Sequence, residues 1–173
     1  MRSMTLKVYL AGPDVFFPDA RAHASRKRAI ARKYGIEGIT PYDNECLPSG
    51  MTPQAIGGLI ARENLLLMQQ ADAVIANITP FRGVSVDAGT AFEIGFMHAL
   101  GKPIYAYSNA SSTYATRYAA QNGGLSLSAE GTLIDSQGHM VEDFSLSDNL
   151  MIAVTSALVR PIEFRETSEA ELW

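Results

Sequence analysis

The sequence lacks the features that define several large classes of protein. It has a single cysteine, Cys46, so neither an intramolecular disulfide nor a metal site made of several cysteines is available. No apolar run approaches the roughly 20 residues of a transmembrane helix. The 14 basic residues are outnumbered by 18 acidic ones, and this balance disfavours a nucleic-acid partner. We therefore expect a cytoplasmic protein that binds a small molecule, with no membrane and no nucleic acid as partner.

The chain of 173 residues suits a single domain, and short apolar runs alternate with helix-compatible segments over its first 108 residues. The runs end at glycine or proline, as buried strands do where they meet a loop. Thr52 followed by Pro53 is typical of a helix start. Strands are expected at 6–11, 36–40, 73–78 and 103–107, and helices at 19–34, 53–70 and 88–100. This alternation predicts one α/β domain over 1–173, a parallel sheet with helices on both faces.

Beyond residue 108 the pattern is weaker. A helix is expected at 111–121 and a hairpin at 132–142, whereas the apolar segment 150–159 is compatible with either a strand or a helix. Six basic residues within 21–33 are interpreted as a solvated helix face. The three histidines lack the spacing of metal ligands, so no metal site is expected.

The predicted helix at 88–100 contains a carboxylate where apolar residues dominate. Its sequence is AGTAFEIGFMHAL, so we expect a helix buried on most sides, with Glu93 in its middle. A buried carboxylate without a partner costs several kcal/mol or shifts its pKa, and sequences tolerate it mostly where chemistry requires it. The alternative is structural, because Thr90 and Glu93 have the spacing of a capping box.

The residues before this helix favour the functional interpretation. Asp87 lies six residues before Glu93, and Gly83 and Gly89 allow a ligand to approach the backbone closely. Because the helix follows a strand, its start lies at the carboxyl edge of the sheet, where open α/β sheets bind ligands. Two carboxylates there suit cleavage of a glycosidic bond. The alternative for Asp87 is a charge that only stabilises the helix N-terminus.

Four segments together resemble the nucleoside 2-deoxyribosyltransferase family: KVYLAGPDVF at 7–16, PYDNE at 41–45, ADAVIANITPFRGVSVDAGTAFEIGFMHALGKPIYAY at 71–107 and DNLMI at 148–152. The resemblance implies a flavodoxin-like or Rossmann-like sheet and a retaining double displacement that needs no metal or organic cofactor. It implies that Glu93 is the nucleophile, that Asp87 holds sugar hydroxyls and that Tyr9 orients the nucleophile. From the strand pattern alone, Tyr9 is an ordinary core aromatic.

Further contacts with substrate are implied by the same resemblance. Glu45 matches a polar residue that touches the base, and Asn149 matches an asparagine that is contributed to a neighbouring subunit's sugar site. A homo-oligomer (dimer, tetramer or hexamer) with shared sites is therefore expected, acting on a nucleoside and a free nucleobase. The motif around Asp87 is most similar to members that accept purines. The remaining residues expected to bind substrate are Gly12, Asp14, Phe16, Asp43, Asn64, Arg82 and Gly89.

One departure from the family pattern concerns the proton for the departing base. Family members commonly carry an aspartate where this chain has Asn64, and an amide cannot supply a proton. We expect Asp14 or Glu45, or a water held by Asn64, to relay a proton to N7 of a purine. Glu63 is expected to face elsewhere, because adjacent helix residues point about 100° apart.

Two other functions are compatible with these residues. The first is an N-glycoside hydrolase, in which water replaces the acceptor base. Its nucleotide-specific relatives need a phosphate site, whereas the first loop has no Ser, Thr, Arg or Lys and Asp14 would repel a phosphate, although Arg82 or Ser85 could still contact one. The second is a non-catalytic nucleoside-binding domain, because a fold does not fix a function.

Overall fold

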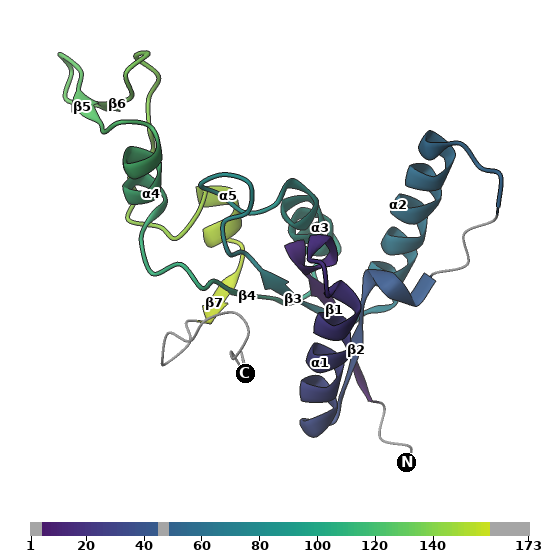
Figure 1. The fold of residues 1–173 in the computed structure, drawn as a ribbon. Helices are drawn as coiled ribbons and strands as arrows, with labels where there is room; N and C mark the ends of the chain where they lie inside the picture. The colour runs from purple at the N-terminus through teal and green to yellow at the C-terminus, as the bar shows by residue number, and fades with distance from the viewer. Residues whose placement is uncertain (1–4, 45–48, 160–173) are drawn as a thin grey trace.

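The structure is a computed structural model that describes residues 5–44 and 49–159 (Figure 1). The predicted strands and helices up to residue 107 are confirmed to within one residue at each end, and segment 150–159 contains both a helix and a strand. In chain order the elements are β1 (Leu6–Ala11), η1 (Pro13–Phe16), α1 (Ala20–Lys33), β2 (Ile36–Ile39), η2 (Pro41–Asn44), α2 (Pro53–Gln70), β3 (Ala73–Asn77), α3 (Ala88–Ala99), β4 (Ile104–Tyr107), α4 (Tyr114–Gln121), β5 (Ser126–Leu127), β6 (Leu133–Ile134), α5 (Leu150–Ala153) and β7 (Ala157–Val159).

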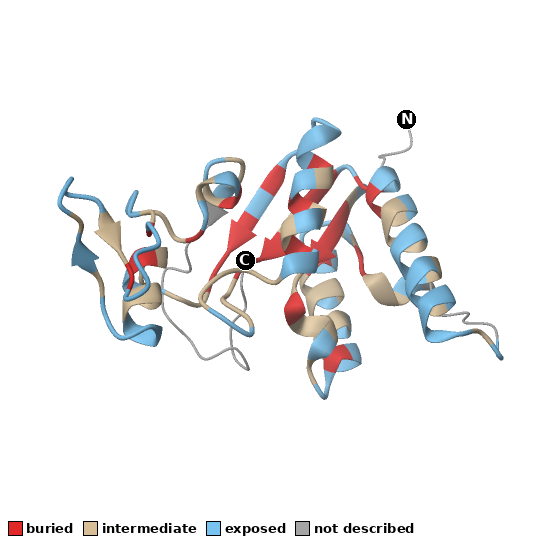
Figure 2. Ribbon diagram, turned by 90° about the horizontal axis from the view of Figure 1, so that it is seen from above, coloured by how far each residue is buried: buried red, intermediate tan, exposed pale blue. Residues whose placement is uncertain are grey.

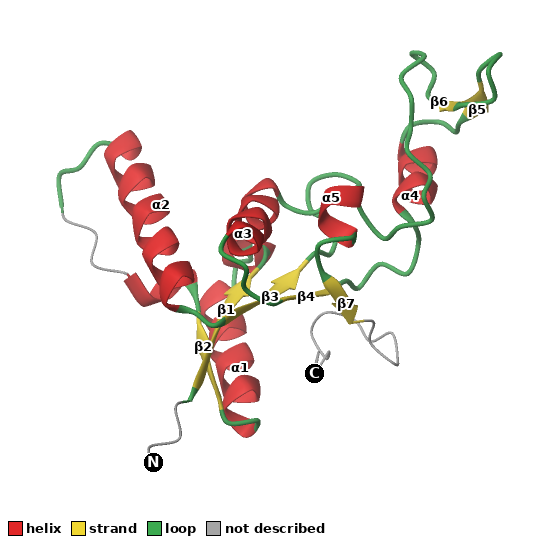
Figure 3. Cartoon of the chain, turned by 180° about the vertical axis from the view of Figure 1, so that it is seen from behind, coloured by secondary structure: helices red, strands yellow, loops and turns green. Residues whose placement is uncertain are grey.

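The central sheet has five parallel strands in the order β2-β1-β3-β4-β7. Counted within the sheet this is the order 2-1-3-4-5 of flavodoxin-like folds, so the predicted α/β fold is confirmed. Helix α1 lies on one face of the sheet, and α2, α3 and α5 lie on the other (Figures 1 and 3). Because the strands are parallel, the loops after β1 and β3 leave from the same edge.

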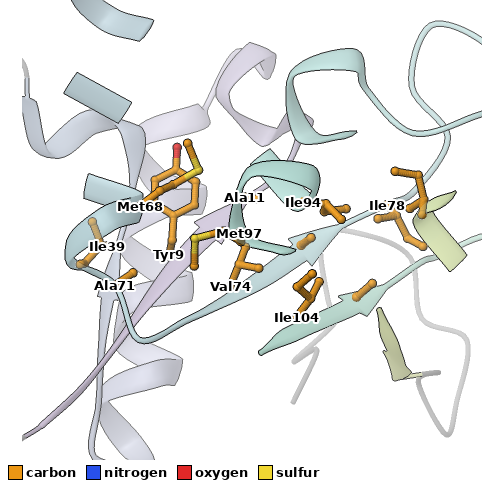
Figure 4. Packing of buried hydrophobic residues seen from close by; sticks show 13 residues of the cluster. Tyr9, Ala11, Ile39, Met68, Ala71, Val74, Ile78, Ile94, Met97 and Ile104 are labelled. Atoms are coloured by element: carbon orange, nitrogen blue, oxygen red, sulfur yellow. The ribbon is translucent and has the colours of Figure 1, made fainter. Parts of the chain in front are cut away.

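The main core lies between the sheet and helices α2 and α3 (Figure 4). Tyr9 of β1 packs there with Met68 of α2 and Met97 of α3, and all three side chains are fully buried. Side chains alternate across a strand, so Val8 and Leu10 point to the opposite face, which α1 covers. Figure 2 shows the buried residues gathered on the strands. This alternation is what directs Tyr9 towards α3.

Helix α2 begins as the sequence predicts. Thr52 is its N-cap and accepts a hydrogen bond from the backbone N–H of Ala55 at 3.3 Å, and Pro53 is the first helical residue. At the other end, the ammonium group of Lys102 donates to the carbonyls of Met68 at 3.0 Å and Gln69 at 2.6 Å. These carbonyls have no partner within the helix, so Lys102 fixes the end of α2 against the sheet.

Helix α3 is less buried than the sequence predicts. Ile94 and Met97 point into the core, but Phe92 is 61% exposed and Leu100, just after the helix, is 43% exposed. The rings of Phe92 and Phe96 stack with their centroids 6.4 Å apart. The expectation of burial on most sides is therefore wrong for the single chain, because the helix rests on the sheet by one face only.

Residues 108–147 form an arm that projects away from the sheet (Figures 1 and 3). It holds α4 and the antiparallel pair β5–β6. The turn expected at 132–142 is present, since the N–H of Val141 donates to the carbonyl of Leu133 at 2.9 Å, but the pairing of this segment with β5 was not predicted. In the part of the chain that the structure describes, no helix is long and apolar enough to cross a membrane.

Candidate active site

A pocket of about 440 Å³ opens at the carboxyl edge of the sheet, within the size range of small-molecule sites. Strands β1 and β3 are neighbours, but the chain leaves β1 towards β2 on one side and leaves β3 towards β4 on the other. The loops after these two strands therefore diverge. The pocket lies between those loops and helix α2. Its lining residues are Gly12, Val15, Phe16, Pro41, Tyr42, Leu59, Ile60, Glu63, Asn64, Asp87, Gly89, Thr90 and Glu93.

The side chains of Tyr9 and Glu93 meet at this pocket. The hydroxyl of Tyr9 donates a hydrogen bond to Oε1 of Glu93 at 2.7 Å. Burial raises the pKa of Glu93 to about 7, the hydrogen bond from Tyr9 opposes the rise, and the negative charge of Asp87 adds to it. Burial, reinforced by the charge of Glu93, also raises the pKa of Tyr9, so the phenol stays a donor at neutral pH. Tyr9 therefore has an aromatic ring in the core and a polar partner at the site.

Asp87 is the N-cap of α3. Its Oδ2 accepts hydrogen bonds from the backbone N–H of Thr90 at 3.1 Å and from the Thr90 hydroxyl at 3.4 Å. The capping-box interpretation of Glu93 is therefore wrong, because Asp87 rather than Thr90 is the N-cap and Glu93 lies in the second turn. A side chain at Gly89 would start 3.0 Å from Asp87 Oδ2, so glycine leaves this carboxylate room. Asp87 thus caps the helix and also lines the pocket.

The loop that leads to Asp87 is held by a buried carboxylate from the C-terminal part of the chain. The side chain of Asp148 has no exposed surface. It accepts hydrogen bonds from the Ser85 hydroxyl and from the N–H of Val86, the latter at 3.0 Å. Arg117 lies 3.7 Å from the same carboxylate and donates to the carbonyl of Val84 at 2.9 Å. Nothing in the sequence analysis assigns Asp148 this role; its only sequence signal is its place in DNLMI.

The loop after β1 contributes Gly12 and Phe16 to the pocket but turns Asp14 away from it. Gly12 has a φ of 151°, and an added Cβ would lie 2.7 Å from the Cβ of Asn77, so only glycine fits there. Asp14 forms an ion pair with Lys27 and accepts from the Asn77 amide at 3.1 Å. It lines a separate small cavity. Lys27 is 12% exposed, so the expectation that all the basic residues of α1 are solvated is wrong at this position.

Arg82 lies on aromatic rings at the edge of the site. Its guanidinium carbon is 4.8 Å from the ring centroids of both Phe16 and Phe81, and those rings stack 5.4 Å apart. Phe16 lines the pocket, whereas Arg82 does not. Arg82 has a φ of 56°, which is uncommon outside glycine. In this arrangement Arg82 supports a pocket wall.

Helix α2 presents two neighbouring residues to the pocket, Glu63 and Asn64. The expectation that Glu63 faces elsewhere is therefore wrong. Leu59 and Ile60, one turn earlier, also line the pocket, so two adjacent rows of the helix border it. Side chains that diverge by about 100° still border one pocket when it is wide enough. Oδ1 of Asn64 is buried and accepts no hydrogen bond from the described residues.

Two other predicted contacts, Asp43 and Asn149, lie outside the pocket lining. Asp43 is not a lining residue; it pairs with Arg28 and accepts from the N–H of Thr40 at 2.8 Å, which fixes the turn after β2. Asn149 is exposed and caps α5 by accepting from the N–H of Met151 at 3.0 Å, away from the pocket of its own chain. Glu45 lies outside the described residues.

The chemistry available here is that of carboxylates. Glu93, Asp87 and Glu63 all line the pocket. Within 5–44 and 49–159, no three His, Cys, Asp or Glu side chains gather as they would around a metal ion. A carboxylate oriented by a phenol can attack an electrophilic carbon such as the anomeric carbon of a sugar, and a second carboxyl group can transfer a proton.

The chain is similar to known sequences over most of its length. The family described as nucleoside 2-deoxyribosyltransferase matches residues 8–151. An uncharacterized protein from Schizosaccharomyces pombe is 32% identical over 155 residues, which cover 83% of this chain and 74% of that protein.

Two solved structures are similar as well. One is a 2-desoxiribosyltransferase from Leishmania mexicana, with a TM-score of 0.65 and 30% identity, covering 85% of each chain. The other is a 2-deoxyribosyltransferase from the psychrotolerant bacterium Bacillus psychrosaccharolyticus, with a TM-score of 0.52. Its identity is 23%, over 64% of this chain and 81% of that chain, so this likeness concerns the fold alone.

Replacing Asp148 by asparagine tests its support of the loop before Asp87. The amide has one acceptor oxygen, so it cannot accept from the N–H groups of Val86 and Asn149 together, and it leaves the charge of Arg117 unmatched. We expect the free energy of unfolding to fall by about 3 kcal/mol, measured by urea titration. Asp143→Asn is the control, because Asp143 is exposed in the same segment; it should change stability by less than about 0.5 kcal/mol. Equal stability of the two variants would contradict this role.

The raised pKa of Glu93 predicts how stability depends on pH. Between pH 4.5 and about 7 the unfolded chain releases the Glu93 proton while the folded chain retains it. Stability of the wild type therefore falls as pH rises through this window, and Glu93→Gln removes the effect. The difference in Tm between Glu93→Gln and wild type should be smallest at pH 4 and grow up to about pH 7. Glu37→Gln, an exposed control on β2, should show no such trend. A constant Tm difference for Glu93→Gln would be inconsistent with this shift.

Proposed function

The chain belongs to the nucleoside 2-deoxyribosyltransferase family, and on that premise we propose that it moves 2-deoxyribose between nucleobases by a retaining double displacement with Glu93 as the nucleophile. As a member of this family it is a glycosyl-transferring enzyme. The observation that carries the proposal is the 2.7 Å hydrogen bond from Tyr9 to Glu93, in a pocket that Asp87 also lines. Such a transfer serves nucleotide salvage, and we assign it to the cytoplasm.

In the first displacement, an oxygen of ionised Glu93 attacks C1′ of a 2′-deoxynucleoside. The C1′–N bond breaks, and its electron pair goes to the departing base. In the second displacement, a ring nitrogen of the incoming base attacks C1′, and the ester bond to Glu93 breaks. Two inversions retain the configuration at C1′. The hydrogen bond from Tyr9 holds Oε1 of Glu93, so the carboxylate faces C1′ in one orientation.

The environment of Glu93 favours formation of the ester. Burial and the charge of Asp87 destabilise the ionised carboxylate, as its raised pKa indicates. The covalent intermediate replaces that charge with a neutral ester, which relieves both penalties. Asp87 lies at the N-terminus of α3 and lines the pocket, where its carboxyl oxygens can accept hydrogen bonds from sugar hydroxyls.

The substrate is a nucleoside rather than a nucleotide in this proposal. Glu63, Asp87 and Glu93 line the pocket, and its described lining includes no lysine, arginine or histidine. A phosphate would meet repulsion without a compensating cation. Asp14 is not the source of this repulsion, because Lys27 neutralises it. The apolar side chains of Phe16, Leu59 and Ile60 supply the surface against which a purine packs.

Incubation with deoxyinosine, with and without adenine, tests the function. We expect deoxyadenosine to form only when adenine is present. Release of hypoxanthine alone, at the same rate with and without adenine, would identify a hydrolase instead. No product under either condition would favour a non-catalytic binding domain.

Glu93→Ala should fold and lose at least about 10³-fold in kcat, because covalent catalysis has no substitute for its nucleophile. Mass spectrometry of wild type loaded with deoxyinosine should place a deoxyribosyl group on the peptide that contains Glu93. Glu37→Ala is the control for the loss of a surface carboxylate and should keep wild-type kcat. A Glu93→Ala variant with more than a tenth of wild-type kcat would sink this assignment.

We also propose a homo-oligomer whose sites are completed across an interface. Asn149 is exposed, and the apolar side chains of Phe92 on α3 and Met151 on α5 are exposed in the single chain. Apolar surface of this kind is covered when subunits associate.

Subunit mixing tests the shared site. Asn149→Ser keeps an N-cap for α5 but removes the amide, so it should fold and be inactive if the amide completes a neighbour's site. When Glu93→Ala and Asn149→Ser chains are refolded together, random assortment into dimers gives one intact site in each mixed pair. About a quarter of wild-type activity should return. Full activity of Asn149→Ser alone, or a monomer by light scattering, would rule out the shared site.

A further inference from the structure

We propose that Glu63 is the general acid and base for the nucleobase: it protonates the departing purine at N7 and removes the corresponding proton from the incoming one. This inference rests on the proposed function. The juxtaposition that carries it is the placement of Glu63 and Asn64, neighbours on α2, in the same pocket as Glu93.

The geometry of α2 gives the two residues different tasks. Asn64 presents a buried Oδ1 that accepts no hydrogen bond from the described residues, so it suits an N–H of the base. It has no proton to transfer. Glu63 is the one titratable residue that α2 contributes to the described lining, and its side chain is 30% exposed. A carboxyl group that is partly open to solvent can exchange its proton with water between turnovers.

Among the residues that the structure describes, the other carboxylates considered for this role, Glu93 apart, are engaged in stronger contacts. Asp14 pairs with the buried Lys27 and lines a different cavity. Asp87 is held by the N-terminus of α3, where its Oδ2 already accepts hydrogen bonds from the N–H and the hydroxyl of Thr90. Asp43 is fixed by Arg28 and the N–H of Thr40. The contact of Glu63 is weaker, because Oε1 lies 3.4 Å from the guanidinium of Arg62, which is mostly exposed.

The proton balance follows directly. As the Glu93 oxygen bonds to C1′, the C1′–N9 bond breaks and its electron pair returns to the purine. The carboxyl proton of Glu63 moves to N7, so the base leaves neutral and Glu63 becomes a carboxylate. In the second displacement N9 of the incoming purine attacks C1′, its N7 proton returns to Glu63, and the bond from C1′ to Glu93 breaks.

The test compares two donor nucleosides of nearly the same shape. Deoxyinosine needs a proton on its base, whereas 7-methyl-2′-deoxyguanosine already carries a positive charge on the imidazole ring. We expect Glu63→Gln to lower kcat for deoxyinosine by about 10²–10³-fold. Cleavage of the methylated nucleoside, after subtraction of its spontaneous rate, should stay within about threefold of wild type. In wild type, kcat for deoxyinosine should fall at high pH as the acid loses its proton. This fall should be absent in Glu63→Gln.

Three further variants make the outcomes distinguishable. Glu37→Gln makes the same chemical change on exposed β2 and should leave both substrates unaffected. Glu93→Gln should lose activity on both substrates. If it keeps that activity, the proposed function itself is wrong. Glu63→Gln combined with Asn64→Asp returns a carboxyl group to the same wall and should recover part of the deoxyinosine activity. Full deoxyinosine activity in Glu63→Gln, or an equal loss with both substrates, would overturn the role of Glu63 while leaving Glu93 in place.

Discussion

The hydrogen bond between Tyr9 and Glu93 is the interaction around which the site is arranged. It joins β1 to α3 through two residues that are 84 positions apart, and it forms only because β1 lies directly beside β3 in the sheet. The alternation of β1 sends Tyr9 to the face that α3 covers. Asp87 caps this helix, which puts Glu93 in the second turn, within hydrogen-bond distance of the tyrosine. A shift of β1 by one residue would send Tyr9 to the other face and leave a carboxylate facing apolar side chains.

This arrangement depends on the conformation of the loop between β3 and α3, which needs contacts from other parts of the chain. The loop between β3 and α3 contains glycine and a residue at positive φ, so its conformation has to be imposed from outside. Asp148 and Arg117 supply that constraint by binding its backbone at Val86 and Val84. Both residues come from the part of the chain after β4, so this later part of the chain holds the loop that leads into α3.

The sequence predicted the elements up to residue 107 closely because each is bounded by a local signal, such as the Thr52–Pro53 cap. It predicted less well wherever the outcome depended on a distant partner. The pairing of Asp14 with Lys27 and the burial of Asp148 come from contacts between separate elements. The prediction for Glu63 was wrong because it assumed that only one row of side chains on α2 faces the site. The pocket is bordered by two adjacent rows of that helix. The helical period gives the angle between neighbouring side chains. The width of the pocket that they border depends on the fold.

The charge distribution of the pocket explains why its three carboxylates have different properties. Coulomb repulsion makes simultaneous ionisation of neighbouring carboxylates costly in a partly buried site. Asp87 accepts a hydrogen bond from the Thr90 N–H at the start of α3, and Glu93 receives one from Tyr9, yet burial and the charge of Asp87 still raise the pKa of Glu93 to about 7. Glu63 has neither a helix N-terminus nor a buried donor, and its described ion pair is with an exposed arginine. The described lining thus carries three carboxylates in three settings: Asp87 caps a helix, Glu93 is buried against a phenol, and Glu63 is partly exposed. In the proposed double displacement these settings divide the work, because an ester on Glu93 would remove the buried charge, whereas the exposed part of Glu63 can exchange a proton with solvent.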